Sequence, residues 1–391
     1  MSDSTYTTIG VVGAGAMGSG IAQVAAQAKT RVILYDLQED ALNRASEQLQ
    51  KILNRLEEKE RISSAKEVFE RIEFINTLDA FKEANLVIEA IIENLEVKQK
   101  VFQSLEKVVA QDCILASNTS SLSITSIAAA CKHPERVLGI HFFNPAPLMA
   151  LVEVIPAIQT RQGLGESMVA LMKSWGKAPV LVKDTPGFIV NRVARPFYSE
   201  ALRIYEEGLA TKEFIDAALT QVGGFRMGPF TLMDYIGHDV NYVVTETVFQ
   251  SFYQDPRYTP SLTQKRLLEA GWLGRKSGKG FFDYSEAFQL PTLDLSDEEV
   301  IKKAEEIVHR VVCMLINEAV DALYLGIANK EDLETAMTRG VNYPKGLLAW
   351  CNEWGSDFVL AKLDVLNQIY KEDRYRPSTM LREYGLLNKK F

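Results

Sequence analysis

The strictest limit on the fold comes from a short glycine-rich stretch, Gly13-Ala14-Gly15-Ala16-Met17-Gly18. It follows an apolar run, residues 7–12, that predicts a buried strand, and it leads into a helix predicted from about Met17 to Ala28. In that setting the first glycine permits a tight turn, the second lets the backbone approach a pyrophosphate, and the third allows close helix packing. The stretch therefore predicts a Rossmann-type doubly wound α/β sheet that binds a dinucleotide.

An acidic residue beyond the glycine stretch indicates which dinucleotide is bound. The strand predicted from Arg31 to Tyr35 ends on Asp36, about 18 residues after Gly18, where such sheets hydrogen-bond the adenosine ribose. A 2′-phosphate at this place would lie about 4 Å from the carboxylate, a repulsion of up to about 4 kcal/mol at an effective dielectric near 20. No arginine follows in residues 37–39 to offset this repulsion. The sequence therefore predicts NAD and not NADP.

Length, charge and cysteines exclude several classes of protein. A chain of 391 residues predicts two or three domains, and its net charge of −8 gives no basic surface for nucleic acid or an anionic membrane. No apolar run approaches the roughly 18 residues of a membrane span, and the first residues lack the features of a targeting segment. The four cysteines are scattered without a CxxC pair, so we expect reduced thiols, no metal site and a cytoplasmic protein.

Apolar runs separated by turn signals predict the rest of the sheet. Six further strands are expected at 72–75, 86–89, 114–117, 137–141, 151–155 and 180–182. They complete a sheet of about eight strands and a first domain of residues 1–183. A long helix predicted from Gln38 to about Glu60 carries a row of basic residues, Lys51, Arg55, Lys59 and Arg61. These residues are either a solvated face or cations for a phosphorylated substrate tail.

Polar residues gather where two of the strands end. Glu93 and Lys98 follow the strand at 86–89, and the run Ser117-Asn118-Thr119-Ser120-Ser121 follows the next strand. Since the carboxyl ends of parallel strands form the ligand edge of a doubly wound sheet, we expect these side chains to face a ligand. Helix capping by Ser121 or Ser123 is the competing interpretation for the serines, although capping needs a single residue.

The stretch from Val137 to Glu153 carries the strongest catalytic signal. Pro145 and Pro147 exclude a helix between the two predicted strands, so His141 closes one strand and Glu153 lies on the next. An imidazole held against a carboxylate has a fixed tautomer and a raised basicity, which suits a general base near neutral pH. The alternative is a core histidine that is hydrogen-bonded to the backbone.

From Asp184 onwards the chain is predicted to be helical and to contain an internal repeat. The segment Glu200-Ala201-Leu202 recurs as Glu318-Ala319-Val320, and Arg257-Tyr258 recurs as Arg374-Tyr375 after one deleted residue. The first helix is expected from about Ile189 to Glu207, with a disturbance at Pro196. The duplication predicts one helical domain at residues 184–290 and a degenerate repeat of it at residues 291–391.

Seven co-linear motifs fall between residues 8 and 284: GVVGAGAMGSGIAQVAA, VIEAIIENLEVK, ASNTSSL, HFFNPAPLM, LVEVI, DTPGFIVNR and MGPFTLMDYIG. Together they resemble the L-3-hydroxyacyl-CoA dehydrogenases. With its duplicated tail the chain is most similar to bacterial members that act on 3-hydroxyadipyl-CoA in phenylacetate catabolism, and to 3-hydroxybutyryl-CoA dehydrogenases. The resemblance implies an enzyme of fatty-acid or aromatic catabolism that oxidises an L-3-hydroxyacyl-CoA reversibly to the 3-oxoacyl-CoA with NAD.

The resemblance also implies roles for individual residues. His141 would take the proton of the 3-hydroxyl group and Glu153 would orient it, while Ser120 and Asn191 would hydrogen-bond the reacting oxygens. The cofactor would contact two sets of residues: Gly13, Gly15, Ala16, Met17 and Gly18 of the glycine stretch, and Asp36, Glu93, Lys98, Asn118 and Asn144. Because His309 stands in the second copy where Asn191 stands in the first, we expect the second copy to be catalytically silent.

The same family pattern bears on partners and on rival functions. Its helical domain looks like a dimer-forming module, so the chain would form a homodimer through it or would pair its two copies in cis. A free β-hydroxyacid dehydrogenase typically has a catalytic lysine where Asn191-Arg192 stands here, and an idle NAD-binding protein would not need the set His141, Glu153, Ser120 and Asn191. Arg192 and Arg195 are either cations for a dicarboxylic acyl chain or structural ion pairs.

Overall fold

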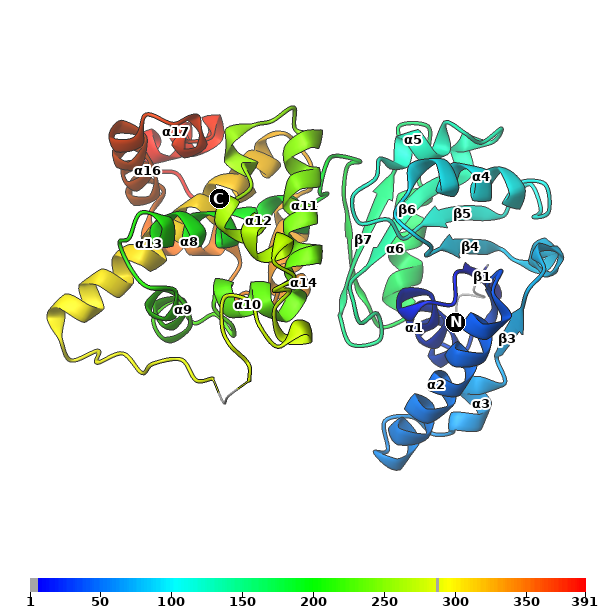
Figure 1. The fold of residues 1–391 in the computed structure, drawn as a ribbon. Coiled ribbons are helices and arrows are strands. Elements are labelled where there is room, and N and C mark those ends of the chain that lie inside the picture. The colour runs from blue at the N-terminus through cyan, green and yellow to red at the C-terminus, as the bar shows by residue number, and fades with distance from the viewer. Residues whose placement is uncertain (1–5, 286–287) are drawn as a thin grey trace. The chain divides into compact units, whose positions relative to one another are not determined.

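The computed structural model describes residues 6–285 and 288–391. This described chain divides into two compact units, one that ends at Thr185 and one that begins at Pro186 (Figure 1). The first unit is a sheet flanked by helices, and the second is built from helices. None of the helices in the described ranges combines the length and the apolar character that a membrane crossing needs.

Within the described residues, eight strands form one sheet in the order β3-β2-β1-β4-β5-β6-β7-β8. Neighbouring strands are parallel except β6 and β7, which are antiparallel. The bounds are β1 Thr8–Val12, β2 Arg31–Tyr35, β3 Ile72–Ile75, β4 Leu86–Glu89, β5 Ile114–Ser117, β6 Val137–Phe142, β7 Leu151–Pro156 and β8 Ala178–Leu181. The predicted Rossmann-type sheet is confirmed. The expected position of the last strand, residues 180–182, is wrong by two residues, because an edge strand tolerates Pro179, which has no N–H to donate.

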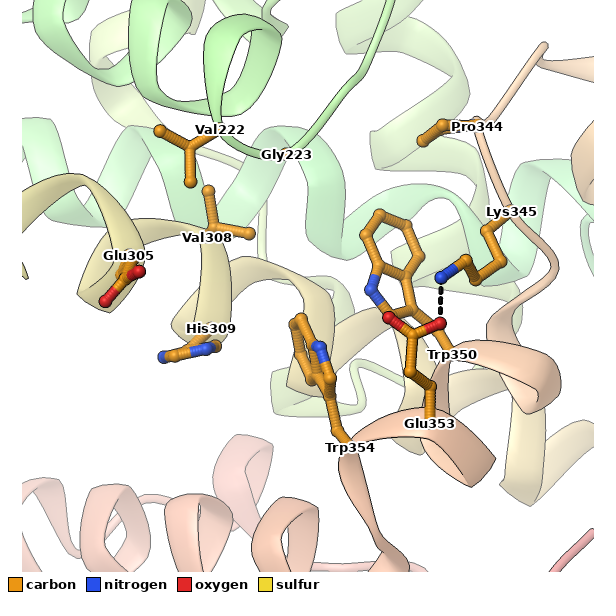
Figure 2. A pocket seen from close by; sticks show the side chains of 10 residues that line it. All are labelled: Val222, Gly223, Glu305, Val308, His309, Pro344, Lys345, Trp350, Glu353 and Trp354. Atoms are coloured by element: carbon orange, nitrogen blue, oxygen red, sulfur yellow. Dashed lines mark hydrogen bonds and ion pairs between the residues drawn. The ribbon is translucent and has the colours of Figure 1, made fainter. Parts of the chain in front are cut away.

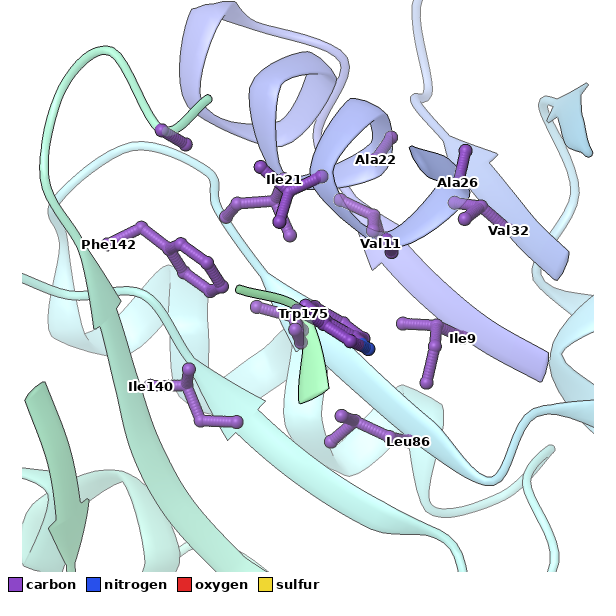
Figure 3. Packing of buried hydrophobic residues seen from close by; sticks show 14 of the residues in the cluster. Ile9, Val11, Ile21, Ala22, Ala26, Val32, Leu86, Ile140, Phe142 and Trp175 are labelled. Atoms are coloured by element: carbon purple, nitrogen blue, oxygen red, sulfur yellow. The ribbon is translucent and has the colours of Figure 1, made fainter. Parts of the chain in front are cut away.

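In the described part of the first unit, six α-helices connect these strands. They are α1 Ala16–Gln27, α2 Glu39–Glu58, α3 Ala65–Phe69, α4 Leu95–Leu105, α5 Ile124–Ala128 and α6 Leu164–Ser174. Ile21 and Ala22 of α1 belong to the same buried cluster as Val11 of β1 and Val32 of β2 (Figure 3). This packing places the N-terminus of α1 at the carboxyl end of β1. There the strand order reverses, since β1 lies between β2 and β4, and such a reversal is where doubly wound sheets bind ligands.

The helices of the second unit form two successive copies of one arrangement. The first copy comprises α7 Val190–Val193, α8 Arg195–Glu206, α9 Lys212–Gln221, α10 Pro229–Ile236, α11 His238–Ser251 and α12 Leu262–Glu269. The second copy comprises α13 Glu298–Tyr324, α14 Lys330–Gly340, α15 Leu347–Trp354, α16 Ser356–Tyr370 and α17 Thr379–Leu387. From α8 and α13 onwards the elements of the two copies correspond one to one. The predicted internal repeat is therefore confirmed.

The two copies differ at their first helix. In the first copy the predicted helix is divided into α7 and α8 at Ala194, because Pro196 has no N–H to continue the helical ladder. In the second copy α13 continues through the equivalent positions as one helix of 27 residues. Helix α8 packs against α13, so the two copies contact each other within one chain (Figure 1).

Candidate active site

The turn between β1 and α1 has the shape that a phosphate-binding loop requires. Gly13 has a φ of +104°, which favours glycine, and a Cβ added at Gly18 would lie 1.7 Å from the carbonyl oxygen of Gly13. Gly15 is different, because a Cβ there would meet nothing within 4 Å among the described atoms. The space beside Gly15 thus serves no packing contact within the described chain and fits the close approach of a pyrophosphate.

The first residues of α1, Ala16 and Met17, offer backbone N–H groups beside this space. The residue that precedes the helix is Gly15, which has no side chain to accept from them. The N-terminus of this helix of 12 residues therefore presents hydrogen-bond donors and a positive dipole end to an anion.

Asp36 is fixed at the end of β2, beside the same loop. Its Oδ2 accepts from the N–H of Ala14 at 2.8 Å, and its Oδ1 accepts from the N–H of Gln38 at 2.9 Å. The side chain is partly exposed. Because a carboxylate has about four lone-pair sites, Asp36 retains acceptor capacity for the hydroxyls of a ribose.

A buried group of charges, which the sequence analysis missed, lies at the ends of β4 and β5. Glu89 Oε1 accepts from Lys98 Nζ at 2.6 Å and from the N–H of Ile91 at 2.8 Å, while its Oε2 accepts from Ser117 Oγ at 2.7 Å. The Lys98 side chain is 1% exposed. Its buried ammonium group lies between two carboxylates, 2.6 Å from Glu89 Oε1 and 3.3 Å from Glu93 Oε2. The sequence signal for this group is Glu89, an acidic residue at the end of an apolar strand.

Glu93 holds the serine-rich loop that follows β5. Its Oε1 accepts from Thr119 Oγ1 at 2.6 Å and from the N–H groups of Ser120 and Ser121 at 2.9 Å and 3.2 Å. Burial acts to raise the pKa of Glu93, but the Lys98 ammonium and these hydrogen bonds outweigh it and keep the pKa below its usual value. The ionised carboxylate therefore fixes the loop that carries Ser120.

Asn118 and Ser123 also have local partners. Asn118 Oδ1 accepts from the N–H of Phe142 at 2.8 Å, which ties the end of β5 to the end of β6, next to His141. Ser123 accepts from the N–H of Ser126 and so caps α5. The capping interpretation thus applies to Ser123, while Ser120 lies in the loop before it.

His141 and Glu153 lie directly opposite each other on β6 and β7. His141 Nδ1 is 2.8 Å from Glu153 Oε2, and the two side chains are 7% and 1% exposed. The turn between these strands contains the expected Asn144, whose peptide bond to Pro145 is cis. The antiparallel register is what brings the imidazole and the carboxylate together, as the sequence predicted.

The pair has a defined chemistry. When Glu153 is ionised and His141 is neutral, the carboxylate accepts the proton of Nδ1 and leaves the lone pair of the ring on Nε2. Such an imidazole can take a proton at Nε2, and the carboxylate stabilises the cation that results. Within the described ranges, no group of three or more His, Cys, Asp or Glu residues is placed to hold a metal ion. The His141–Glu153 pair offers acid–base chemistry in the same unit as a loop that fits a dinucleotide.

The remaining predicted residues lie in the second unit. Asn191 is on the single-turn helix α7 and is partly exposed. Its neighbour Arg192 makes ion pairs with Glu318 and Asp321, so the ion-pair interpretation applies to this arginine. Arg195 is buried and donates to Thr245 Oγ1 at 3.0 Å.

Family models match nearly the whole chain. The model for the 3-hydroxyacyl-CoA dehydrogenase NAD-binding domain matches residues 8–185. The model for the C-terminal domain of the same enzymes matches residues 187–284 and 307–390. The second model thus covers both helical copies, in agreement with the repeat seen in the sequence and in the fold.

Similar proteins carry related names. The chain is 39% identical to a 3-hydroxyadipyl-CoA dehydrogenase of Escherichia coli K12, across 97% of this chain and 98% of that protein. It is 42% identical to a probable 3-hydroxybutyryl-CoA dehydrogenase of Deinococcus radiodurans, across 70% of this chain and 99% of that protein. A crystal structure of 3-hydroxybutyryl-CoA dehydrogenase from Escherichia coli K12 matches with a TM-score of 0.93 and 37% identity, across 98% of this chain and 99% of that one. This chain therefore belongs to the 3-hydroxyacyl-CoA dehydrogenase family.

Proposed function

We propose that this protein is an NAD-dependent L-3-hydroxyacyl-CoA dehydrogenase that converts a 3-hydroxyacyl-CoA reversibly to the 3-oxoacyl-CoA. The observation that carries the proposal is the His141–Glu153 pair, with Nδ1 and Oε2 2.8 Å apart, in the same unit as a glycine loop that fits a dinucleotide. A hydroxyl group must lose its proton as its carbon loses a hydride. The proposed base and the proposed cofactor loop meet these two needs.

The cofactor would be held by backbone and side chains of the first unit. The N–H groups of Ala16 and Met17 would bind the pyrophosphate beside Gly15, and Asp36 would accept from the adenosine ribose hydroxyls. Its negative charge disfavours a 2′-phosphate, which supports NAD over NADP. The remaining proposed contacts are Gly13, Gly18, Glu93, Asn118 and Asn144. Lys98 would act through Glu89 and Glu93, since its ammonium lies 2.6 Å and 3.3 Å from their carboxylates.

The proton transfer is assigned to His141. In the oxidation direction Nε2 takes the proton of the 3-hydroxyl group, and Glu153 stabilises the imidazolium through Nδ1. Bound NAD supplies the acceptor for the hydride that leaves C3. Ser120 and Asn191 would donate hydrogen bonds to the reacting oxygens and so hold the substrate. In the reduction direction the imidazolium returns its proton to the ketone oxygen.

The finer substrate assignment follows the names of the relatives. Similarity over nearly the full length to a 3-hydroxyadipyl-CoA dehydrogenase and to a 3-hydroxybutyryl-CoA dehydrogenase supports a short acyl chain on coenzyme A. Since Arg192 makes ion pairs within the protein, Arg195 is the remaining candidate for binding a second carboxylate of the substrate. The four free thiols, Cys113, Cys131, Cys313 and Cys351, support a cytoplasmic enzyme.

Absorbance of NADH tests the function in the reduction direction. We expect NADH to be oxidised with acetoacetyl-CoA, little oxidation with acetoacetate, and little with NADPH in place of NADH. Equal rates with the free acid would favour a β-hydroxyacid dehydrogenase. The absence of any turnover, together with tight NADH binding, would favour an idle NAD-binding protein. A comparison of kcat/KM for 3-hydroxybutyryl-CoA and 3-hydroxyadipyl-CoA then assigns the chain length.

A further inference from the structure

Buried side chains of the two helical copies form hydrogen bonds with each other in a pseudo-two-fold arrangement. Glu318 of α13 accepts from Tyr258 Oη of the first copy at 2.7 Å. Glu200 of α8 accepts from Tyr375 Oη and from Arg310 Nε of the second copy, at 2.7 Å and 2.6 Å. Glu200 and Glu318 occupy equivalent positions in the repeat, as do Tyr258 and Tyr375. Each copy therefore places the same acid against the tyrosine of the other.

Arg192 joins this exchange directly beside Asn191. Its Nη2 donates to Asp321 Oδ2 at 2.9 Å, and its Nε lies 3.5 Å from Glu318 Oε2. The Arg192 side chain is 1% exposed, and its guanidinium lies 5.2 Å from the centroid of the Phe252 ring. Both acids belong to the second copy. The residue next to Asn191 is thus fastened by the copy that lacks this asparagine.

The helix that carries Asn191 needs such external support. Helix α7 has 4 residues, and a single turn is not stable in water by itself. It follows a tight turn in which Gly187 and Phe188 have φ values of +73° and +49°. Helix α7 contacts α8 and α11 of the first copy and α13 and α14 of the second. The second copy therefore provides a large part of the surface that holds α7 in place.

The equivalent position in the second copy has its own support. His309 lies in the middle of the continuous helix α13. Its ring packs edge-on against Trp354, with centroids 4.9 Å apart, and it lines a pocket of about 380 Å³ (Figure 2). Its neighbour Arg310 pairs with Glu200 and Glu207 of the first copy. Both arginines thus pair with two acids of the other copy. Arg192 belongs to the short helix that carries Asn191, whereas Arg310 belongs to the long helix α13.

We propose that Glu318 and Asp321 are positioning residues for the reaction: through Arg192 they hold α7 and orient the amide of Asn191 toward the substrate. The inference deepens the proposed function and rests on the substrate contact assigned there to Asn191. The second copy, silent in itself, is then part of the catalytic machinery of the first. The second copy can lack the asparagine and still have the two acids, because the asparagine would contact the substrate whereas the acids hold α7.

A matched pair of substitutions in the full chain tests the proposal. Glu318→Gln and Glu200→Gln each replace one buried carboxyl group at equivalent places, so both should lower the thermal midpoint. Glu318→Gln should also lower kcat for acetoacetyl-CoA reduction on the order of 10- to 100-fold, since a displaced substrate contact is that costly. The KM for NADH should not change, and Glu200→Gln should keep the kcat of the wild type. Equal losses of kcat in both variants, or a wild-type kcat in Glu318→Gln, would overturn the proposal.

A milder pair covers the case in which Glu318→Gln fails to fold. Asp321→Asn weakens the contact with Arg192 at a side chain that is 16% exposed, and Glu207→Gln is its match on Arg310. We expect a lower kcat for Asp321→Asn and an unchanged kcat for Glu207→Gln, and equal kcat values would overturn the proposal. The activity of the wild-type protein distinguishes failure of the proposed function from failure of the positioning role. An inactive wild type refutes the proposed function, whereas an active wild type with an unaffected Asp321→Asn refutes the positioning role alone.

Discussion

Among the residues that the structure describes, two buried imidazole–carboxylate pairs have nearly the same N–O distance but different surroundings. His141 and Glu153 face each other across two strands of the first unit, with 2.8 Å between Nδ1 and Oε2. His238 and Asp234 lie one turn apart in the second unit, with 2.9 Å between Nε2 and Oδ1. The distance alone does not distinguish a proton-transfer site from a structural pair. The neighbours of each pair do.

Asp234 and His238 are surrounded by structural partners. Asp234 accepts from the N–H groups of Phe281 and Phe282 and from Tyr284 Oη, and both side chains of the pair are 0% exposed. The second ring nitrogen of His238 lies 3.3 Å from Gln264 Nε2. This pair therefore fastens the segment that closes the first helical copy.

In the second copy the two equivalent positions carry neither a carboxylate nor an imidazole. Asn352 stands where Asp234 stands in the first copy, and it exchanges hydrogen bonds with the backbone of Phe391. Ser356 stands in place of His238 and donates to the carbonyl oxygen of Lys389 at 2.8 Å. The comparison of the two copies thus shows which residue types can replace one another in a structural role. The His141–Glu153 pair, by contrast, retains some exposure and lies in the unit with the glycine loop.

The largest expected effect is on turnover at His141. His141→Gln removes the proposed base and should lower kcat about 10²- to 10⁴-fold, with little change in the thermal midpoint. The matched variant His238→Gln should lower the thermal midpoint and keep the turnover of each folded molecule. Steady-state NADH oxidation with acetoacetyl-CoA and a thermal melt of both proteins measure the two effects. A reversed pattern would show that the pairs have been assigned the wrong way round.

The next effect is on the stability of the second unit. Asp234→Asn leaves several buried donors with a weaker acceptor, and we expect a loss of about 3 kcal/mol in the free energy of unfolding. Equilibrium urea denaturation gives this value. A loss below about 0.5 kcal/mol would contradict the structural role, because substitutions away from such features have effects of that size.

A smaller loss of turnover is expected at the acid of the first pair. Glu153→Gln removes a charge-assisted hydrogen bond worth about 1.5–3 kcal/mol, so kcat should fall about 10- to 100-fold. The KM for NADH should stay at its wild-type value, since the change does not touch the glycine loop. An unaltered kcat would mean that the imidazole does not depend on its carboxylate.

The smallest effect concerns a third acid, Glu93, which fastens a loop at the site itself. Its pKa in the folded protein is below its usual value of 4.5, so the native state binds fewer protons than the unfolded state in that range. The stabilisation is therefore present above pH 4.5 and is lost as the pH falls through the folded pKa. Urea denaturation should show wild type more stable than Glu93→Gln at pH 7, with a smaller difference near pH 3.5. A difference that grows as the pH falls would contradict this linkage.

Local signals in the sequence predicted the features that depend on neighbouring residues. Apolar runs between turn residues gave seven of the strands to within one residue, and the prolines after Asn144 gave the turn that brings His141 opposite Glu153. Pro196 indicated the break between α7 and α8. The repeat predicted the order of helices in the second copy. In each case a few adjacent side chains determine the backbone.

The features that were missed depend on contacts between distant segments. Glu89 ends an apolar strand, and its role is visible when Lys98 and Ser117 converge on it. Arg192 was left open between a substrate cation and an ion pair, because its partners Glu318 and Asp321 lie more than 120 residues further along the chain. No local pattern in the sequence indicates such an ion pair. In the repeat, Arg192 and Glu318 correspond to Arg310 and Glu200, which also form an ion pair.

The most direct test of the central proposal is kcat for His141→Gln, Glu153→Gln and the variant that carries both substitutions. If Glu153 acts through the imidazole, the second substitution should have almost nothing left to remove, and the double variant should be as slow as His141→Gln alone. Losses that multiply, or a His141→Gln variant with the turnover of the wild type, would contradict general-base catalysis by the His141–Glu153 pair.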